Sequence, residues 1–283
     1  MPLGKFKVLV TGANGQLGKE IQRQLGKKFN LILTDTDNMD ITDKQQVDRV
    51  IKREKPDCII HAAAYTQVDA AEENRKLCRK INALGTKNIA EAASKIGAIL
   101  IYISTDYIFD GKKNRPYTER DEPHPLSVYG RTKLKGENYT KALCKKYYII
   151  RTAWVFGEGK NFVETMLTLA KKMQSINVVN DQIGSPTCTK DLVMVIGKII
   201  ESKIAYGIYN FSGLNPCSWY DFAKEIFSQT GTSVLLKPIL STGYPQKAKR
   251  PAYSYLDKYK IQKALGISIR TWKEMLEDYL SNN

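Results

Sequence analysis

Short apolar runs alternate with longer amphipathic stretches along the first half of the chain. The apolar runs predict strands at 6–11, 30–35, 57–61, 98–103 and 147–151. Helical spacing between them predicts a helix at 16–25, one at 43–54 capped by Thr42 or Asp43, two helical stretches within 67–97, and one at 128–145. Strands that are apolar throughout and alternate with helices are typical of a parallel sheet covered by helices on both faces.

Beyond residue 152 the alternation becomes irregular. The pattern predicts a helix at 161–173, a strand near 177–180, a helix at 189–202, a turn-rich stretch at 242–251 and two short helices in the tail. We therefore expect an α/β fold, a Rossmann-like doubly wound parallel sheet with a smaller C-terminal lobe. In such sheets ligands bind at the carboxyl ends of the strands, so the loops that follow strands are the places to search for chemistry.

Composition narrows the class of protein. The chain has 283 residues, is 42% hydrophobic and 26% charged, and carries five cysteines and two histidines. These values are typical of a globular protein, and no apolar run reaches the roughly 18 residues that span a bilayer. Residues 1–5 lack the apolar region of a secretory signal. The odd cysteine number without a C-x-x-C pair favours reduced thiols and a cytoplasmic location, and no metal-ligand spacing appears.

The formal net charge of +15 requires separate treatment, because a basic chain often binds nucleic acid or anionic membranes. Here the lysines are scattered, as at 52–53, 112–113, 145–146 and 171–172, without a basic amphipathic stripe or a stacking-aromatic motif. We therefore expect neither a nucleic-acid nor a membrane partner. A small diphosphate-bearing ligand is compatible with this charge.

A glycine-rich turn follows the first predicted strand. Gly12, Gly15 and Gly18 are spaced G-x-x-G-x-x-G between that strand and the next helix. Glycine permits a tight turn and lets the backbone approach a pyrophosphate, while the helix N-terminus offers free N–H groups to the anion. The pattern differs from the standard G-x-G-x-x-G fingerprint, but its place in the first strand–helix turn predicts a dinucleotide site.

An acidic residue at the end of the second strand bears on which dinucleotide binds. Asp35 lies about twenty residues beyond the middle glycine, where a carboxylate bonds the adenosine ribose hydroxyls. A carboxylate there repels a 2′-phosphate, so NADH is expected over NADPH, which is kept as the second choice. The competing interpretation is that Asp35, Asp37 and Asp40 only form a loop and capping cluster.

Tyr129 and Lys133 form a Y-x-x-x-K at the start of a predicted helix. Residues four apart share one helical face, and an ammonium group nearby favours the phenolate and lowers the pKa of a tyrosine. Such a pair can act as a general acid toward a developing alkoxide. Thr105, after the fourth strand, lies at the same edge of the sheet, and its hydroxyl can hydrogen-bond a substrate carbonyl.

The glycine turn, this threonine and the Y-x-x-x-K occur in the order found in the extended short-chain dehydrogenase/reductase superfamily, which the chain resembles. Four further segments resemble the dTDP-4-dehydrorhamnose reductase family. They are Ala-Ala-Ala-Tyr-Thr-Gln-Val-Asp-Ala-Ala-Glu at 62–72, Ser-Thr-Asp-Tyr-Ile-Phe-Asp-Gly at 104–111, Asp-Gln-Ile-Gly-Ser-Pro-Thr at 181–187, and Arg-Pro at 250–251 followed by Ser254 and Leu256. The matches extend from residue 7 to about 260, nearly the whole chain.

The resemblance implies roles for individual residues. Thr105, Tyr129 and Lys133 match the catalytic triad, with Tyr129 protonating the C4 oxygen and Lys133 also holding the nicotinamide ribose. The expected cofactor-binding residues are Gly12, Asn14, Gly15, Gln16, Leu17, Asp35, Asp40, Ile41, Ala62, Ala63, Ala64, Tyr65, Asn82, Tyr129 and Lys133. The expected substrate-binding residues are Val68, Thr105, Tyr107, Trp154 and Arg250, the arginine at the diphosphate. Trp154 is equally compatible with a packed core aromatic. Some members of the family hold a magnesium ion at a dimer contact, but no carboxylates for one can be placed here.

These roles divide the chain into residues 1–152 for the dinucleotide, with a returning segment near 174–204, and residues 153–283 as mainly the substrate-binding lobe. The implied reaction is NAD(P)H-dependent reduction of the C4 keto group of a nucleotide-linked deoxysugar, most plainly dTDP-4-dehydrorhamnose to dTDP-rhamnose, a precursor of cell-surface polysaccharide, by a monomer or homodimer. A sugar-nucleotide dehydratase is disfavoured, because it uses Asp-Glu after the threonine and here Asp106-Tyr107 follows. Another nucleotide-sugar reductase, an epimerase, and a non-catalytic dinucleotide-binding regulatory subunit stay open as alternatives.

Overall fold

The computed structural model describes residues 6–202 and 204–282, so the expectation for residues 1–5 lies outside them. Six parallel strands form the central sheet in the order β10-β5-β4-β3-β1-β2. The strands are β1 (Lys7–Thr11), β2 (Asn30–Thr34), β3 (Cys58–His61), β4 (Ile99–Thr105), β5 (Tyr147–Thr152) and β10 (Gly207–Asn210). The chain winds outward in both directions from the point between β1 and β3, which confirms the doubly wound parallel sheet.

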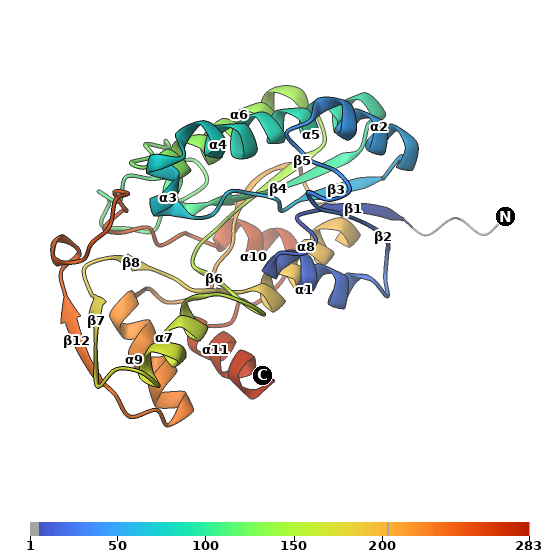
Figure 1. Ribbon diagram of the computed structural model, residues 1–283. Coiled ribbons are helices and arrows are strands. Elements are labelled where there is room, and N and C mark those ends of the chain that lie inside the picture. The colour runs from blue at the N-terminus through green and yellow to red at the C-terminus, as the bar shows by residue number, and fades with distance from the viewer. Residues whose placement is uncertain (1–5, 203, 283) are drawn as a thin grey trace.

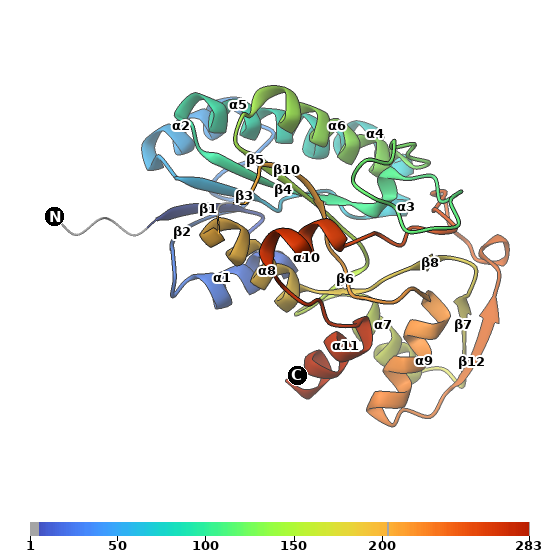
Figure 2. The same ribbon diagram turned by 180° about the vertical axis from the view of Figure 1, so that it is seen from behind.

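Helices cover both faces of this sheet (Figure 1). One face carries α2 (Lys44–Glu54), α3 (Val68–Glu73), α4 (Arg75–Arg79), α5 (Thr86–Ile96) and α6 (Val128–Leu143). The other carries α1 (Gln16–Leu25), α8 (Thr189–Ser202) and α10 (Tyr259–Leu265), as the reverse view also shows (Figure 2). The strands are buried on both sides, and Val8, Leu9 and Val10 of β1 are fully buried, which explains their unbroken apolar pattern.

Local sequence explains where several of these helices begin and end. The Asp43 carboxylate accepts the Gln45 and Gln46 N–H groups and starts α2, so Asp43, of the two predicted caps, is the residue used. The Ser127 hydroxyl accepts the Gly130 N–H and starts α6. Sequence analysis predicts two helical stretches within 67–97. The structure divides this range into α3, α4, a π-helical segment η1 (Lys80–Gly85) and α5; π-helical turns are frequent at functional sites.

The C-terminal lobe lies beside one edge of the sheet (Figures 1 and 2). Its helices are α7 (Phe162–Ala170), α9 (Trp219–Thr230) and α11 (Trp272–Ser281). Three pairs of short strands join its loops: β7 (Ser175–Val179) with β12 (Leu235–Ile239), β8 (Ile183–Gly184) with β11 (Cys217–Ser218), and β6 (Val155–Phe156) with β9 (Thr187–Cys188). Short 3₁₀ turns are η2 (Asp106–Ile108), after β4, and η3 (Ser241–Gly243), after β12.

The lobe and the sheet share one hydrophobic core. Ile60 and Ile150 of the sheet belong to the same buried cluster as Ile196 of α8, Phe222 of α9 and Trp272 of α11. α8, inside the predicted returning segment, packs on α1, and β10 just beyond that segment joins the sheet. β7, also inside it, pairs with β12 outside the sheet. The shared core fixes the lobe against the strand ends and so holds both walls of the cleft between them.

Within the described ranges 6–202 and 204–282, helices of the length and apolar content needed to cross a membrane do not occur. All five cysteines are buried free thiols.

Candidate active site

A cavity of about 870 Å³ opens at the carboxyl ends of the strands, between the sheet and the lobe. Its walls come from the loops that follow β1, β2, β3, β4 and β5, and from α6 and α9. Lys160 and Asn161, just before α7, also line it. The predicted site residues that line it are Gly12, Asn14, Gly15, Gln16, Leu17, Asp35, Asp40, Ile41, Ala62, Ala63, Ala64, Val68, Thr105, Tyr107, Tyr129, Lys133 and Trp154. Residues from widely separated parts of the chain thus meet at the switch point of the sheet.

The glycine turn packs tightly against the segment that follows β3. Gly12 has φ +68°, and a Cβ there would come within 2.9 Å of the Ala63 backbone. A Cβ at Gly18 would come within 2.3 Å of the Gly12 carbonyl oxygen. Both positions therefore require glycine, one for its left-handed backbone and both for lack of space. The backbone and the start of α1 consequently form the floor of the cavity.

This end of the cavity fits a dinucleotide. The first amides of α1, from Gln16, Leu17 and Gly18, have no carbonyl partners inside the helix, and these residues line the cavity. Free amides at a helix N-terminus are suited to bind an anion. The Gln16 Oε1 atom is buried and has no hydrogen-bond partner among the described residues, while its Nε2 donates to the Lys160 carbonyl. An unpartnered buried oxygen on the cavity wall favours a polar ligand.

Asp35 lies at the edge of the same cavity. Its carboxylate accepts the Asn14 N–H at 2.9 Å and the Thr36 N–H at 2.8 Å. It thereby links the end of β2 to the glycine turn and still borders the cavity. Asp40 instead binds the Thr42 N–H and hydroxyl, so the two aspartates occupy separate hydrogen-bond groups rather than one capping cluster.

Three predicted site residues, all within the described ranges, do not line the cavity: Tyr65, Asn82 and Arg250. Asn82 is buried in η1, where its side chain accepts the Tyr65 N–H at 2.7 Å and donates to the Tyr65 carbonyl at 3.1 Å. It holds the 62–65 segment in place from behind. The Arg250 guanidinium donates to both oxygens of Asp69 on α3, at 3.1 and 2.6 Å.

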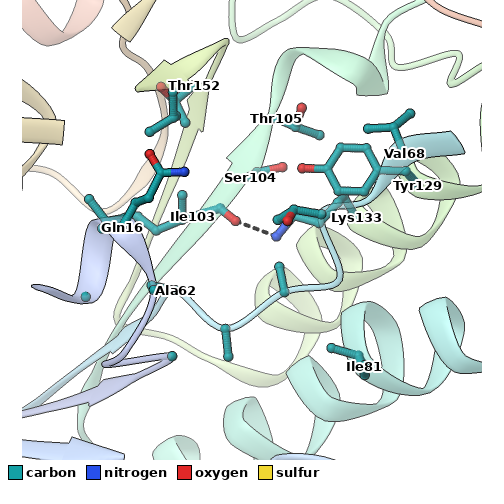
Figure 3. A pocket seen from close by; sticks show the side chains of 18 of the residues that line it. Gln16, Ala62, Val68, Ile81, Ile103, Ser104, Thr105, Tyr129, Lys133 and Thr152 are labelled. Carbon is teal, nitrogen blue, oxygen red and sulfur yellow. Dashed lines mark hydrogen bonds between the residues drawn. The ribbon is translucent and has the colours of Figure 1, made fainter. Parts of the chain in front are cut away.

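Thr105, Tyr129 and Lys133 come together on one wall. Thr105 ends β4, while Tyr129 and Lys133 occupy the first two turns of α6. Figure 3 shows the Thr105 and Tyr129 hydroxyl groups turned toward the same space, with Gln16 across the cavity. The Tyr129 hydroxyl hydrogen-bonds to Thr105. The Lys133 ammonium donates to the Ile103 carbonyl at 2.6 Å and lies 4.2 Å above the Tyr102 ring.

The electrostatics of this wall differ from the sequence-based expectation that a lysine lowers the tyrosine pKa. Burial raises the pKa of Tyr129, and the hydrogen bond with Thr105 only partly offsets it. Burial lowers the pKa of Lys133 to about 7, with the Glu137 carboxylate opposing that shift. Desolvation therefore outweighs the attraction between charges here. The phenol is held in its protonated form, which is the form that a proton donor needs.

Aromatic side chains enclose the far end of the cavity. Tyr107 meets Tyr129 edge-on, with ring centroids 5.9 Å apart. Trp154 has φ +46° and stacks on Trp219 of α9 at 3.6 Å, with the rings 9° from parallel. A left-handed backbone at a bulky residue is strained and is typical of functional sites, and both indoles border the cavity. Trp154 thus packs on Trp219 and also lines the cavity.

Sequence reasoning missed several residues of this wall. Asp106, Lys160 and Trp219 line the cavity without having been assigned a role. Trp219 directly follows Ser218, whose hydroxyl and Asp221 form a capping box, and that S-x-x-D pattern is a local signal that could have placed it at a helix start. Among residues 6–202 and 204–282, His, Cys, Asp and Glu side chains form no group of three or more that could hold a metal.

Comparison with known proteins identifies the family of the chain. The family model described as the RmlD substrate binding domain matches residues 6–283. The dTDP-4-dehydrorhamnose reductase of Aggregatibacter actinomycetemcomitans is 43% identical, over 96% of this chain and 97% of its own. A crystal structure of the enzyme of that name from Clostridium acetobutylicum is 49% identical with a TM-score of 0.95, over 98% of this chain and 99% of its own.

A second crystal structure bears on the cofactor. The dTDP-4-dehydrorhamnose reductase of Bacillus anthracis, determined in complex with NADP, is 41% identical with a TM-score of 0.96, over 99% of this chain and 100% of its own. These matches cover nearly the full length of both chains and include both the sheet and the lobe. The protein therefore belongs to the RmlD substrate binding domain family, the family of the dTDP-4-dehydrorhamnose reductases.

Proposed function

We propose that this protein is an NAD(P)H-dependent oxidoreductase that reduces the C4 keto group of dTDP-4-dehydrorhamnose to give dTDP-rhamnose. The observation that carries the proposal is the meeting of Thr105, Tyr129 and Lys133 on one wall of the cavity, opposite the glycine turn. The relatives of that name, at 34–43% identity over nearly full length, support the choice of substrate.

The chemistry that a nicotinamide would supply here, when held along the glycine turn, is a hydride for C4. The protonated Tyr129 hydroxyl gives its proton to the C4 oxygen, so the carbonyl becomes a secondary alcohol and the phenol becomes a phenolate. The Thr105 hydroxyl donates a hydrogen bond to the same oxygen. Lys133, four residues after Tyr129, stabilises the phenolate and holds the nicotinamide ribose.

Other parts of the cavity bind the two ligands. Gly12, Gln16 and the start of α1 hold the pyrophosphate, Asp40 and Ile41 flank the adenine, and the segment 62–65, supported by Asn82, lines the cofactor. Val68, Tyr107 and Trp154 contact the sugar. Arg250 would reach the diphosphate only by leaving Asp69. Residues 1–152 with α8 and β10 accordingly form the dinucleotide unit, and most of the remainder forms the substrate lobe. The enzyme acts in the cytoplasm, as a monomer or a homodimer.

A substrate panel tests the proposal. Purified protein is mixed with NADH or NADPH and with dTDP-4-dehydrorhamnose, a GDP-linked 4-keto sugar or a UDP-linked hexose, and oxidation of the cofactor is followed by absorbance. We expect turnover with the dTDP sugar. Cofactor oxidation only with another keto sugar would indicate a different reductase. Conversion of the UDP-linked hexose to its epimer, followed by chromatography and without net oxidation of the cofactor, would indicate an epimerase. Dinucleotide binding without any turnover would indicate a regulatory subunit.

For the cofactor we propose a preference for NADH, with NADPH also accepted. Asp35→Ala should weaken NADH binding more than NADPH binding, because the Asp35 carboxylate bonds the ribose hydroxyls of NADH and repels a 2′-phosphate. Dissociation constants from fluorescence titration of both dinucleotides check this. Asp37→Ala, two residues away and exposed, is the matched control and should change neither constant. Equal losses for the two dinucleotides in Asp35→Ala would contradict the ribose contact.

A further inference from the structure

A buried carboxyl group lies directly behind the threonine of the triad. Asp106 is 2% exposed, and the Thr105 hydroxyl donates to its Oδ1 at 3.0 Å. The Ser254 hydroxyl, from the segment after Arg250, donates to its Oδ2 at 2.6 Å. Both carboxylate oxygens are therefore occupied by hydroxyl donors, one of which belongs to the proposed active site.

The Thr105 hydroxyl has only one proton, so its partners compete. It accepts the Tyr107 N–H at 3.1 Å and hydrogen-bonds with Tyr129. While Asp106 is ionised, the carboxylate can only accept, and the Thr105 proton is committed to it. A Thr105 hydroxyl in this state cannot donate to a substrate carbonyl. If Asp106 is protonated, it donates to Thr105 instead, and the threonine proton becomes free for the substrate.

We propose that Asp106 is a positioning residue whose protonated form turns the Thr105 hydroxyl toward the C4 oxygen of the substrate. The inference rests on the proposed reduction and adds to it a residue that acts through Thr105. During reduction, negative charge develops on the C4 oxygen until it receives a proton. Two hydroxyl groups that donate hydrogen bonds to this oxygen would stabilise that charge. An ionised Asp106 presents only the Tyr129 proton.

The surroundings of Asp106 favour its neutral form. Burial raises the pKa of Asp106 to about 7, and the hydrogen bonds from Ser254 and Thr105 lower it only in part. Asp106 interacts electrostatically with the phenols of Tyr107 on η2 and Tyr129 on α6, and burial raises the pKa of both. The Arg250 guanidinium faces Asp69 and Tyr107, and the ammonium of Lys133 is influenced by Glu137 and Cys78. An increase of pH through about 7 should therefore ionise Asp106 and lower the rate.

The test compares profiles of kcat against pH for three proteins. Asp106→Asn should lose the alkaline decrease that belongs to Asp106, because an amide can donate to Thr105 while accepting from Ser254 at every pH. The ratio of kcat at pH 8 to kcat at pH 6 should be about tenfold higher in Asp106→Asn than in wild type, because pH 8 lies about one unit above this pKa. Ser254→Ala removes one donor to the carboxylate and should move the decrease upward by about one to two pH units.

Asp110→Asn is the matched control. This carboxylate lies four residues further along and accepts the Tyr117 hydroxyl, so its replacement should leave the profile unchanged. The ionisation of Lys133 is common to all four proteins and cancels in the comparison. Identical alkaline decreases in wild type, Asp106→Asn and Ser254→Ala would overturn the inference. A purely structural role for Asp106 would not remove the decrease in Asp106→Asn and move it to higher pH in Ser254→Ala.

A second measurement does not depend on turnover. Difference infrared spectroscopy of the ligand-free protein should show the carbonyl stretch of a protonated carboxyl group that disappears near pH 7 and is missing in Asp106→Asn. A carboxylate that stays ionised from pH 5 to pH 9 would overturn the inference even if the enzyme reduces the sugar. Conversely, a titrating Asp106 in a protein that turns over no sugar would contradict the proposed function alone.

Discussion

Tyr129→Phe should lower kcat by about 10²- to 10⁴-fold, the usual scale for loss of a general acid. The substitution removes the proton that the C4 oxygen receives and leaves the ring that meets Tyr107 edge-on. Because the cofactor contacts along the glycine turn are unchanged, the dissociation constant for NADH should change little. Steady-state kinetics with the dTDP sugar and fluorescence titration with NADH measure the two quantities separately.

Tyr139→Phe is the control for this substitution. Tyr139 lies on the same helix, α6, where its ring is 5.8 Å from the Lys87 ammonium and does not border the cavity. Loss of its hydroxyl should therefore leave both kcat and NADH binding at the wild-type level. If Tyr129→Phe also kept the wild-type rate, the proton would have to come from another group, and the assigned role would be wrong.

Sequence analysis predicts well those site residues that lie at or just after strand ends, because short local patterns in the sequence mark these positions. An apolar run fixes where β1 and β4 lie, and the carboxyl ends of parallel strands must meet at one edge of the sheet. Gly12 after β1 and Thr105 at the end of β4 are placed by this rule. The Ser127 cap and the i, i+4 spacing then place Tyr129 and Lys133 on one face of α6.

Non-local contacts explain what the sequence does not predict. β10 has a short, mixed sequence and becomes a strand by pairing with β5, some sixty residues earlier in the chain. The strand β12 contains Pro238 and pairs with β7, although proline usually demotes a strand prediction. The partners of these segments are fixed by the tertiary fold, and their own side chains give little periodic signal.

The pKa shifts of buried groups also cannot be predicted from the sequence. The spacing of Tyr129 and Lys133 indicates a lysine that lowers the tyrosine pKa, but burial has the larger effect on the pKa of both groups. Nothing in the sequence near Asp106 indicates its burial, and one of its hydrogen-bond partners, Ser254, lies almost 150 residues later in the chain. Only the folded arrangement decides between desolvation and attraction at such positions.

Behind the triad, Arg151→Met should lower the free energy of unfolding by about 3–5 kcal/mol, the cost of leaving one charge of a buried pair without its partner. Arg151 of β5 and Glu137 of α6 are 2% and 0% exposed at their side chains. The guanidinium donates to the two Glu137 oxygens at 3.0 and 2.8 Å. Without it, the one hydrogen-bond donor left to the carboxylate among residues 6–202 and 204–282 would be the Ser104 hydroxyl, at 2.6 Å. Urea-induced equilibrium unfolding measures the loss.

Two comparisons separate this effect from a general loss of packing. Lys19→Met breaks the exposed pair with Glu158 and should cost less than about 1 kcal/mol. The double variant Arg151→Met with Glu137→Leu removes both charges and should be more stable than Arg151→Met alone, because no unpaired buried charge is left. A double variant less stable than the single one would mean that the Glu137 contacts, including the Ser104 hydrogen bond, outweigh the cost of the unpaired carboxylate. Since Ser104 donates to Glu137 and precedes Thr105, the same pair also fixes the strand end on which the hydroxyl of the triad is placed.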